Sequence, residues 1–228
     1  MSDFRERYKD LVDNLGSYTI HILGCGAIGS SSGLQLVRMG ADNLRLYDDD
    51  TVGIENVGVS QYGNSHIDSY KVHALRELML NINPDAEIEA FDRLFTRRVY
   101  EPQGNDIIVI GFDSMSSRAE AIDTIDRYKD KPVLLLDGRM GAEQYQQYAF
   151  TPFNAEEYLK TWYSDADGDP EPCTAKATSY CSNMAGSFMT NAVKKFAIGQ
   201  PLETGIMFHF PSMTLELEGF NPPNACQR

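Results

Sequence analysis

Short strand-like segments alternate with helical segments over the first 141 residues of the chain. The strand-like segments lie at 18–23, 43–47, 87–91, 106–110 and 132–136. The helical segments between them lie at 30–39, 69–82 and 114–128. Strands separated by helices, several of them apolar throughout, are typical of a parallel sheet that is covered on both faces. The pattern therefore predicts an α/β fold with a Rossmann-like, mostly parallel sheet and helices on both faces.

The pattern changes after Gly141. We expect an exposed antiparallel strand, a polar crossover loop, a long helix and the two strands of a hairpin, at 144–150, 151–177, 178–197, 204–210 and 213–217. A short polar helix is expected at the N-terminus, with Ser69 as a cap of the helix at 69–82 and a frayed tail after Gly219. The chain then divides into an N-terminal helix, a Rossmann-like core, a C-terminal extension of antiparallel strands and a tail, at 1–16, 17–141, 142–220 and 221–228.

A glycine-rich turn follows the first strand. Its sequence is Gly24-Cys25-Gly26-Ala27-Ile28-Gly29, and the next strand ends in three acids, Asp48 to Asp50. Strand, glycine turn, helix, strand and acid form the first βαβ unit of a nucleotide-binding sheet. Gly24 permits the tight turn, Gly26 lets backbone N–H groups approach a phosphate, and Gly29 lets the helix pack against the strand. The helix N-terminus attracts an anion, and an acid after the second strand can accept from ribose hydroxyls.

Further polar residues follow the carboxyl ends of the predicted strands. Lys71 lies in the first turn of its helix, where the helix dipole disfavours a cation, so we expect it to have an anionic partner. An NAD(P)-binding oxidoreductase explains the glycine turn and Asp48 but gives Lys71 and Asp113 no role. A nucleoside triphosphate with Mg²⁺ uses them, because Mg²⁺ binds carboxylate and phosphate oxygens and a lysine neutralises phosphate charge. The residues that would form such a site are Asp48, Asp50, Asn56, Gln61, Lys71 and Asp113.

Composition narrows the class of protein. The formal net charge of −13 over 228 residues argues against a nucleic-acid partner, because phosphate binding needs a basic face. The sequence has no apolar stretch of membrane-spanning length and no leader pattern at Met1, so we expect a cytoplasmic protein with no membrane partner. No Cys-x-x-Cys pair is present, which leaves a four-thiolate zinc site without support.

At these motifs the chain resembles the ThiF/MoeB/HesA superfamily, the adenylyltransferases that are similar to ubiquitin-activating enzymes. The matching motifs, in the order of the family, are Gly24–Ser30, Leu46–Val52, Glu55–Gln61, Ile67–Val72 and Asp113 with Arg118. A weaker resemblance continues through Cys173 and the helix after it. The resemblance implies that a C-terminal carboxylate attacks the α-phosphate of ATP in a Mg²⁺-dependent reaction, giving an acyl-adenylate and pyrophosphate.

The resemblance also implies roles for individual residues. Asp48 resembles the acid that binds the ribose, while Asp50 and Asp113 resemble the groups that hold Mg²⁺. Lys71 and Asp113 would be catalytic through positioning and charge stabilisation. Cys173 is a candidate nucleophile for the activated acyl group or for sulfur. The residues that resemble the family's nucleotide contacts are Gly24, Gly26, Ala27, Ile28, Gly29, Asn56, Gln61 and Lys71.

The partner that the resemblance implies is a ubiquitin-like or sulfur-carrier protein, or a peptide with a free C-terminus, and the enzyme is expected to be a homodimer. Two of the departures from the family concern expected cations. Ser60 replaces the usual arginine before Gln61, and the N-terminal motif is reduced to Arg7-Tyr8, so that Arg5, Arg7 or Lys9 would have to serve in the partner's site. These departures keep a non-catalytic subunit of a heteromeric activating enzyme open as an alternative. Adenylation of a carboxylate on a modified tRNA base is a further alternative, which the acidic charge disfavours.

Overall fold

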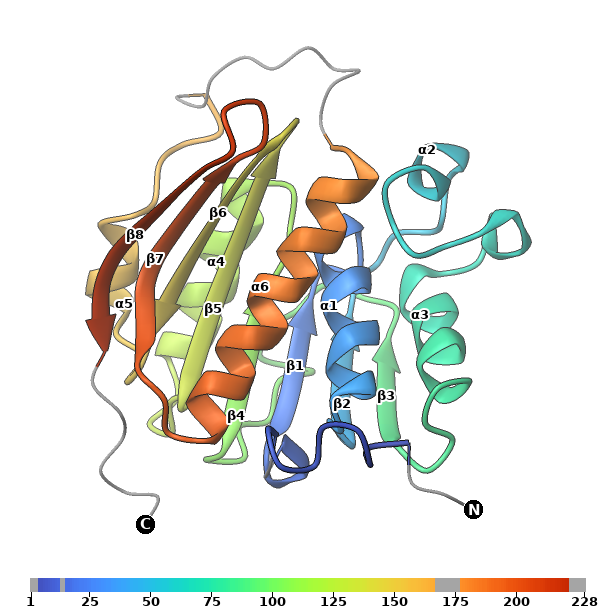
Figure 1. Cartoon of the computed structure of the whole chain (residues 1–228), viewed down its shortest axis with the longest axis horizontal. Coiled ribbons are helices and arrows are strands. Elements are labelled where there is room, and N and C mark those ends of the chain that lie inside the picture. The colour runs from blue at the N-terminus through green and yellow to red at the C-terminus, as the bar shows by residue number, and fades with distance from the viewer. Residues whose placement is uncertain (1–3, 13–14, 167–176, 222–228) are drawn as a thin grey trace.

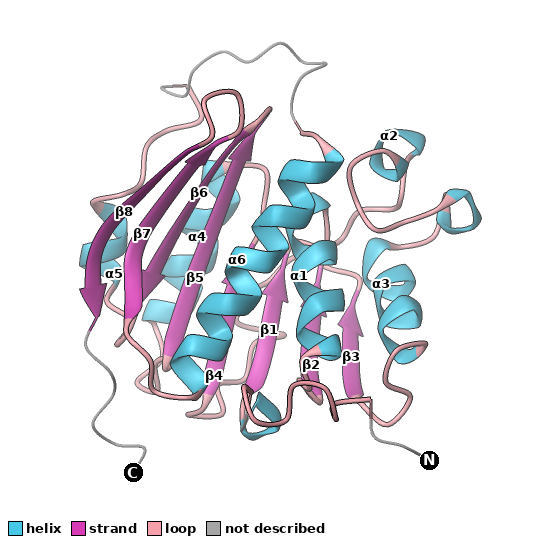
Figure 2. Cartoon of the chain, in the orientation of Figure 1, coloured by secondary structure: helices cyan, strands magenta, loops and turns pink. Residues whose placement is uncertain are grey.

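One continuous sheet of eight strands forms the centre of the computed structural model (Figure 1, Figure 2). The structure describes residues 4–12, 15–166 and 177–221. The strands lie in the order β3-β2-β1-β4-β5-β6-β7-β8. Their bounds are β1 Thr19–Leu23, β2 Asn43–Tyr47, β3 Glu87–Phe91, β4 Asp106–Ile110, β5 Leu134–Gly141, β6 Gln144–Phe150, β7 Leu202–His209 and β8 Thr214–Asn221. The helices are α1 Ala27–Arg38, α2 Ile54–Val57, α3 Lys71–Leu80, α4 Met115–Asp126, α5 Ala155–Leu159 and α6 Ser179–Ala197, with short 3₁₀ turns at Leu15–Ser17 and Asn64–His66.

The first five strands are parallel to one another, as the alternation of strands and helices predicts. β1 pairs with β2 on one side and with β4 on the other. From β1 the strand order runs one way to β2 and β3 and the other way to β4 and β5, so the order reverses between β1 and β4. In open α/β sheets, ligands bind at the carboxyl ends of the strands next to such a reversal. The turn after β1 and the loop after β4 meet at this place.

The last three strands extend the sheet by antiparallel pairing. Asp137 is the last residue of β5 that pairs with β4, and β5 continues to Gly141. At about 3.3 Å per residue, the antiparallel strands therefore rise about 13 Å above the carboxyl edge of the parallel strands. They form a wall beside the site described below (Figure 1).

Two layers of helices cover the sheet, one on each face. On one face α1, α3 and α6 pack on alternate residues of the strands, including Ile20 and Val109. On the other face α4 and α5 pack on the residues between them, such as Ile108 and Leu135. β1 and β4 are buried along their whole length because both of their faces are covered. Among the helices within the described residues, none combines the length and apolarity needed to cross a membrane.

Two expectations for the N-terminal half are wrong. Residues 5–11 form turns instead of a helix, and a 3₁₀ turn follows at Leu15–Ser17. The reason is that Leu11 is 66% exposed, which leaves this segment little apolar surface to bury on the core. Ser69 does not cap α3, which begins after Tyr70 without a side-chain cap. The chain is extended there because Tyr70 forms a bridge with Thr51.

The C-terminal half has the expected order of elements, with three corrections. β6 has the predicted bounds but is not exposed on both faces, because β7 pairs with it and α6 covers Tyr145 and Ala149. The segment expected to be only a loop contains α5, whose first turn is capped by the side chain of Asn154. β8 continues to Asn221, beyond the Gly219 at which fraying was expected. The proposed domain boundaries remain a prediction.

Candidate nucleotide-binding site

The glycine turn has the geometry of an anion site. Gly24 has φ +85°, which a side chain would disfavour, and a Cβ on Gly29 would lie 1.8 Å from the carbonyl oxygen of Gly24. Both positions therefore require glycine. A Cβ on Gly26 would meet no described atom within 4 Å, so the turn faces open space there. α1 starts at this point without a side-chain cap, which leaves its first backbone N–H groups for a ligand.

Asp48 links the glycine turn to the end of β2. One carboxylate oxygen accepts from the backbone N–H of Cys25 at 2.7 Å, and the other accepts from that of Asp50 at 2.9 Å. Burial raises the pKa of Asp48, against the opposing charge of Lys71. The carboxylate of Asp48 therefore orients the turn in addition to any contact that it makes with a ribose.

Lys71 has the anionic partner that its place in the helix predicts. Its Nζ lies 2.7 Å from Oδ2 of Asp50 and 3.9 Å from Oδ1 of Asp48. Burial by itself would lower the pKa of Lys71, but the charges of Asp48 and Asp50 outweigh burial and raise it. Asp113, which is exposed after β4, also contributes to this field. Lys71 thus interacts electrostatically with all three of the predicted acids, Asp48, Asp50 and Asp113.

The loop between β2 and α3 supplies the other predicted contacts. The side-chain oxygen of Asn56 accepts from the N–H of Gly53 at 2.9 Å, which holds the single turn of α2. The backbone N–H of Gln61 donates to Oγ of Ser30 in the first helical turn of α1 at 3.2 Å. The hydroxyl of Tyr62 then donates to the carbonyl oxygen of Cys25 at 2.5 Å. This loop is therefore fixed to the glycine turn.

The acids after β2 are suited to a hard cation. Asp48, Asp49 and Asp50 each offer a carboxylate oxygen, and these oxygens lie within 4.8 Å of one another. Carboxylate oxygens are the protein ligands that Mg²⁺ prefers, so this donor set fits the metal. Of the two residues predicted to hold it, Asp50 belongs to this group of oxygens and Asp113 does not. The Lys71 ammonium contacts the same carboxylate of Asp50, which shows that the site already accommodates a positive charge.

Cys173, the predicted nucleophile, lies outside the described residues. The predicted N-terminal cations lie away from the site. Arg5 pairs with Asp42 at 2.7 Å, at the end of the sheet opposite the site, and Lys9 pairs with Glu6 at 2.6 Å. Neither cation therefore lies in the site of its own chain.

Two other cysteines are buried. Cys25 has no exposed surface, and burial raises the pKa of its thiol well above the ordinary value. Cys181 lies on the buried face of α6, and burial raises its pKa to about 11. Reactive cysteines have exposed thiols of lowered pKa, so the structure favours a packing role for both residues.

Sequence reasoning missed a buried charge cluster next to the site. Arg118 donates to Asp137 at 2.9 Å and to the carbonyl oxygen of Gly138 at 2.7 Å. Arg139 donates to the other oxygen of Asp137 at 2.9 Å. Burial would raise the pKa of Asp137, but the two guanidinium groups outweigh burial and lower it. Asp137 and Arg139 both lie in β5, and nothing in the sequence indicates that Asp137 joins two arginines.

The segment after α5 is fixed to the start of α4, close to Asp113. The carboxylate of Asp165 accepts from the N–H groups of Met115 and Ser116 at 2.6 and 3.1 Å. The indole of Trp162 donates to the carbonyl oxygen of Met115 at 2.9 Å. The hydrogen bonds from the backbone of Met115 and Ser116 lower the pKa of Asp165. The sequence gives no indication of this contact between residues 50 apart.

A hollow of about 500 Å³ lies beside the acids, at the carboxyl ends of β2 and β3. Its size is within the range of small-molecule sites. The residues that line it are Asp49, Asp92, Arg93, Leu94, Thr96, Arg98 and Val99. Asp49 connects the hollow to the acids that follow β2.

The fold and this edge of the sheet define a Rossmann-like protein with a candidate nucleotide site. The sequence profile of the ThiF family matches residues 2–226. The chain therefore belongs to the ThiF family, as the motifs indicate.

Individual relatives match shorter segments. The chain is 31% identical over 94 residues to the tRNA threonylcarbamoyladenosine dehydratase of Bacillus subtilis (strain 168), which covers 41% of this chain and 37% of that protein. It is 33% identical over 84 residues to ubiquitin-like modifier-activating enzyme 5 of Oryza sativa subsp. japonica, which covers 36% of this chain and 20% of the relative. These matches thus span between a fifth and two fifths of the relatives.

Solved structures share the fold over nearly the whole chain. A crystal structure of E. coli MccB with ATP superposes with a TM-score of 0.69 at 14% identity, covering 93% of this chain and 67% of MccB. A crystal structure of PaaA gives a TM-score of 0.70 at 16% identity, covering 96% of this chain and 67% of PaaA. The predicted parallel sheet with its antiparallel extension is therefore confirmed.

Proposed function

We propose that this protein is an ATP- and Mg²⁺-dependent adenylyltransferase. Its acceptor is the C-terminal carboxylate of a ubiquitin-like or sulfur-carrier protein, or of a peptide. The observation that carries this proposal is the group formed by Lys71, Asp48 and Asp50. It lies beside the glycine turn, where α1 begins without a side-chain cap. A lysine among carboxylates is suited to a triphosphate with a divalent cation, and an NAD(P) site leaves it without a role.

In the proposed reaction, an acceptor carboxylate oxygen forms a bond to the α-phosphorus of ATP. The bond between this phosphorus and the oxygen that bridges to the β-phosphate breaks, and pyrophosphate leaves. The turn at Gly24–Gly29 and the start of α1 hold phosphate oxygens, while Lys71 stabilises the charge that develops on them. Mg²⁺, when bound, would neutralise further phosphate charge, and Asp50 and Asp113 are the residues that would hold it. Asn56 and Gln61 contact the triphosphate, and Asp48 accepts from the ribose.

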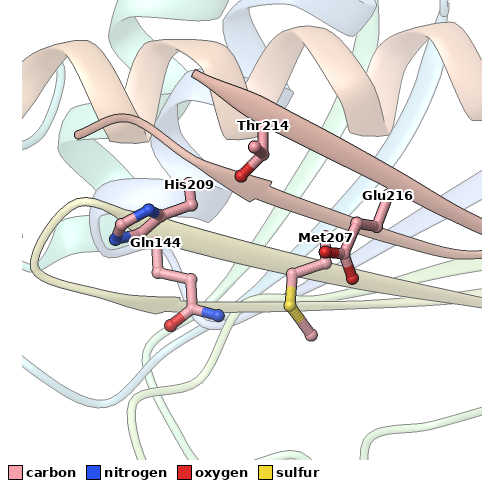
Figure 3. A pocket seen from close by; sticks show the side chains of 5 residues that line it. All are labelled: Gln144, Met207, His209, Thr214 and Glu216. Carbon is pink, nitrogen blue, oxygen red and sulfur yellow. The ribbon is translucent and has the colours of Figure 1, made fainter. Parts of the chain in front are cut away.

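The acceptor approaches along the antiparallel strands. A cavity of about 230 Å³ lies on this wall, and Figure 3 shows its lining side chains on β6, β7 and β8. His209, Thr214 and Glu216 provide polar groups there, and Met207 provides an apolar one. Two similarities support an acceptor of this kind. One relative is a ubiquitin-like modifier-activating enzyme, and MccB, which has a similar fold, has been crystallised together with MccA.

Two further features belong to the same proposal. Cys173 takes the acyl group from the adenylate as a thioester, with release of AMP. The protein acts as a homodimer, in which Arg5, Arg7 or Lys9 reaches the site of the other subunit. If Cys173→Ser keeps the first half-reaction and loses a thiol-sensitive acyl adduct, the thioester step is supported. A monomeric mass in light scattering at working concentration would contradict the dimer.

ATP–pyrophosphate exchange tests the central step. The assay is run with and without Mg²⁺, in the presence of ubiquitin-like proteins or peptides that end in Gly-Gly. Exchange that requires both Mg²⁺ and a free carboxylate is the expected result. Bound ATP without exchange would favour a non-catalytic subunit, and binding of NAD without ATP would overturn the proposal.

A second candidate substrate is a carboxylate on a modified tRNA base. The similarity to a tRNA threonylcarbamoyladenosine dehydratase favours it, and the net charge of −13 opposes it. Adding total tRNA to the exchange assay distinguishes the two acceptors. Exchange that depends on tRNA and not on a protein tail would select the second candidate.

A further inference from the structure

The start of α6 contacts the loop that carries Gln61. The Nε2 of Gln61 donates to Oδ1 of Asn183 at 3.0 Å, across 122 residues of sequence. Next to it, Oγ of the buried Ser182 donates to the carbonyl oxygen of Val59 at 2.7 Å. The Nε2 of Gln35 on α1 donates to the backbone carbonyl oxygen of Asn183 at 3.1 Å. The start of α6 is thus joined both to the loop and to the helix of the glycine turn.

These hydrogen bonds fix the direction in which the amide of Gln61 points. The Nδ2 of Asn183 donates to the carbonyl oxygen of Ser179 at 2.8 Å, so its Oδ1 is the atom that faces Gln61. An oxygen acceptor at that position requires Gln61 to present its NH₂ group. One hydrogen of this group binds Asn183, and the other can be donated to a phosphate oxygen. The backbone of Gln61 is held separately by Ser30.

We propose that Asn183 is a positioning residue that orients Gln61 for a nucleotide phosphate. This proposal rests on the proposed function, because it assigns a purpose to the orientation of a triphosphate contact. The proposal links the nucleotide side of the protein to α6, which begins directly after the crossover segment. Binding energies are reciprocal, so a nucleotide that orders Gln61 also stabilises the start of α6.

The test is a double-mutant cycle on nucleotide binding. The variants are Asn183→Ala, Gln61→Ala and the double variant, with Asn191→Ala as the control. Asn191 is an exposed asparagine two turns further along the same helix, so both alanine substitutions make the same change in helix propensity. The Kd for AMPCPP with Mg²⁺ is measured by calorimetry, and the KM for ATP and kcat are measured by pyrophosphate exchange.

We expect Asn183→Ala to weaken AMPCPP binding and raise the KM for ATP by about two- to tenfold, the effect of one hydrogen bond, with less change in kcat. In the Gln61→Ala background it should have no further effect. Asn191→Ala should match the wild type. Alanine is the better helix former, so the melting temperature of Asn183→Ala should not fall.

Three results would overturn the proposal. One is an unchanged Kd and KM in Asn183→Ala, and another is an equal loss in the wild-type and Gln61→Ala backgrounds. A wild-type protein that binds no ATP would overturn it together with the proposed function. If the wild-type protein binds ATP and shows exchange, the first two results would overturn only the role of Asn183.

Discussion

The ammonium group of Lys71 lies 2.7 Å from the carboxylate of Asp50 and only 11% of its side chain is exposed. The two residues come from the start of α3 and from the end of β2, and the backbone N–H of Lys71 also donates to the carbonyl oxygen of Asp50 at 3.0 Å. Lys71 is therefore held at the site by both its backbone and its charge. In the proposed reaction, Asp50 would hold the metal and Lys71 would stabilise the phosphate charge.

Replacing Lys71 by alanine should abolish most of the exchange activity. The developing phosphate charge loses its nearest cation, and losses on the order of 100-fold are typical when such a group is removed. ATP–pyrophosphate exchange measures the effect. Lys129→Ala, on the exposed segment after α4, is the control and should keep full activity. Equal rates for the Lys71→Ala variant and the wild type would contradict the role of Lys71.

The variants Asp50→Asn and Asp113→Asn should need more Mg²⁺ for half-maximal exchange. If the two acids hold the metal as proposed, each variant removes a negative oxygen ligand, so the requirement should rise by on the order of tenfold while the fold is kept. A Mg²⁺ titration of the exchange rate is the measurement, with Asp123→Asn on the exposed side of α4 as control. If both site variants have the metal requirement of the wild type, these two acids do not hold the metal.

The sequence predicted the parts of this site that depend on local patterns. Gly24, Gly29 and Asp48 follow from the βαβ unit, and the partner of Lys71 follows from the helix dipole. Side-chain contacts between segments that are distant in the sequence produce no local sequence pattern. Gln61 and Asn183 are 122 residues apart, and either amide alone is compatible with a solvated surface.

Solvent exposure was also difficult to predict from pattern alone. Three of the seven residues of β6 are glutamines, which favours an exposed strand, but Gln147 is 1% exposed and accepts from the hydroxyl of Tyr145 at 3.0 Å. Arg118 lies in the first turn of α4 and nevertheless points into the core, where it pairs with Asp137. Burial of polar groups depends on partners that only the tertiary fold brings together.

The Asp137→Asn variant should be strongly destabilised. It leaves Arg118 and Arg139 without their shared carboxylate in a buried position, and breaking such a pair costs about 3 to 5 kcal/mol. Urea unfolding followed by circular dichroism measures the change. Asp123→Asn breaks the exposed pair with Arg127 and should cost less than about 1 kcal/mol. Similar losses in the two variants would show that burial of the cluster does not matter.

The same cluster predicts a contribution to acid stability. The pKa of Asp137 is lowered in the folded protein, so its stabilising effect is complete above the ordinary pKa of 3.8 and is lost as the pH falls through the lower, folded value. Between pH 5 and pH 2 the free energy of unfolding should therefore fall more steeply in the wild type than in Asp137→Asn. Parallel curves over this range would contradict a lowered pKa.

Cys25 and Cys181 should resist alkylation in the native protein. Both thiols are buried, and burial raises both pKa values, to about 11 for Cys181, so little thiolate forms at pH 8. Iodoacetamide followed by peptide mass spectrometry gives the extent of modification at each cysteine. Labelling in urea is the control, because both residues must react once the chain is unfolded. Rapid native labelling of Cys25 would mean that the glycine turn opens, and a nucleotide that fills the site should then slow the reaction.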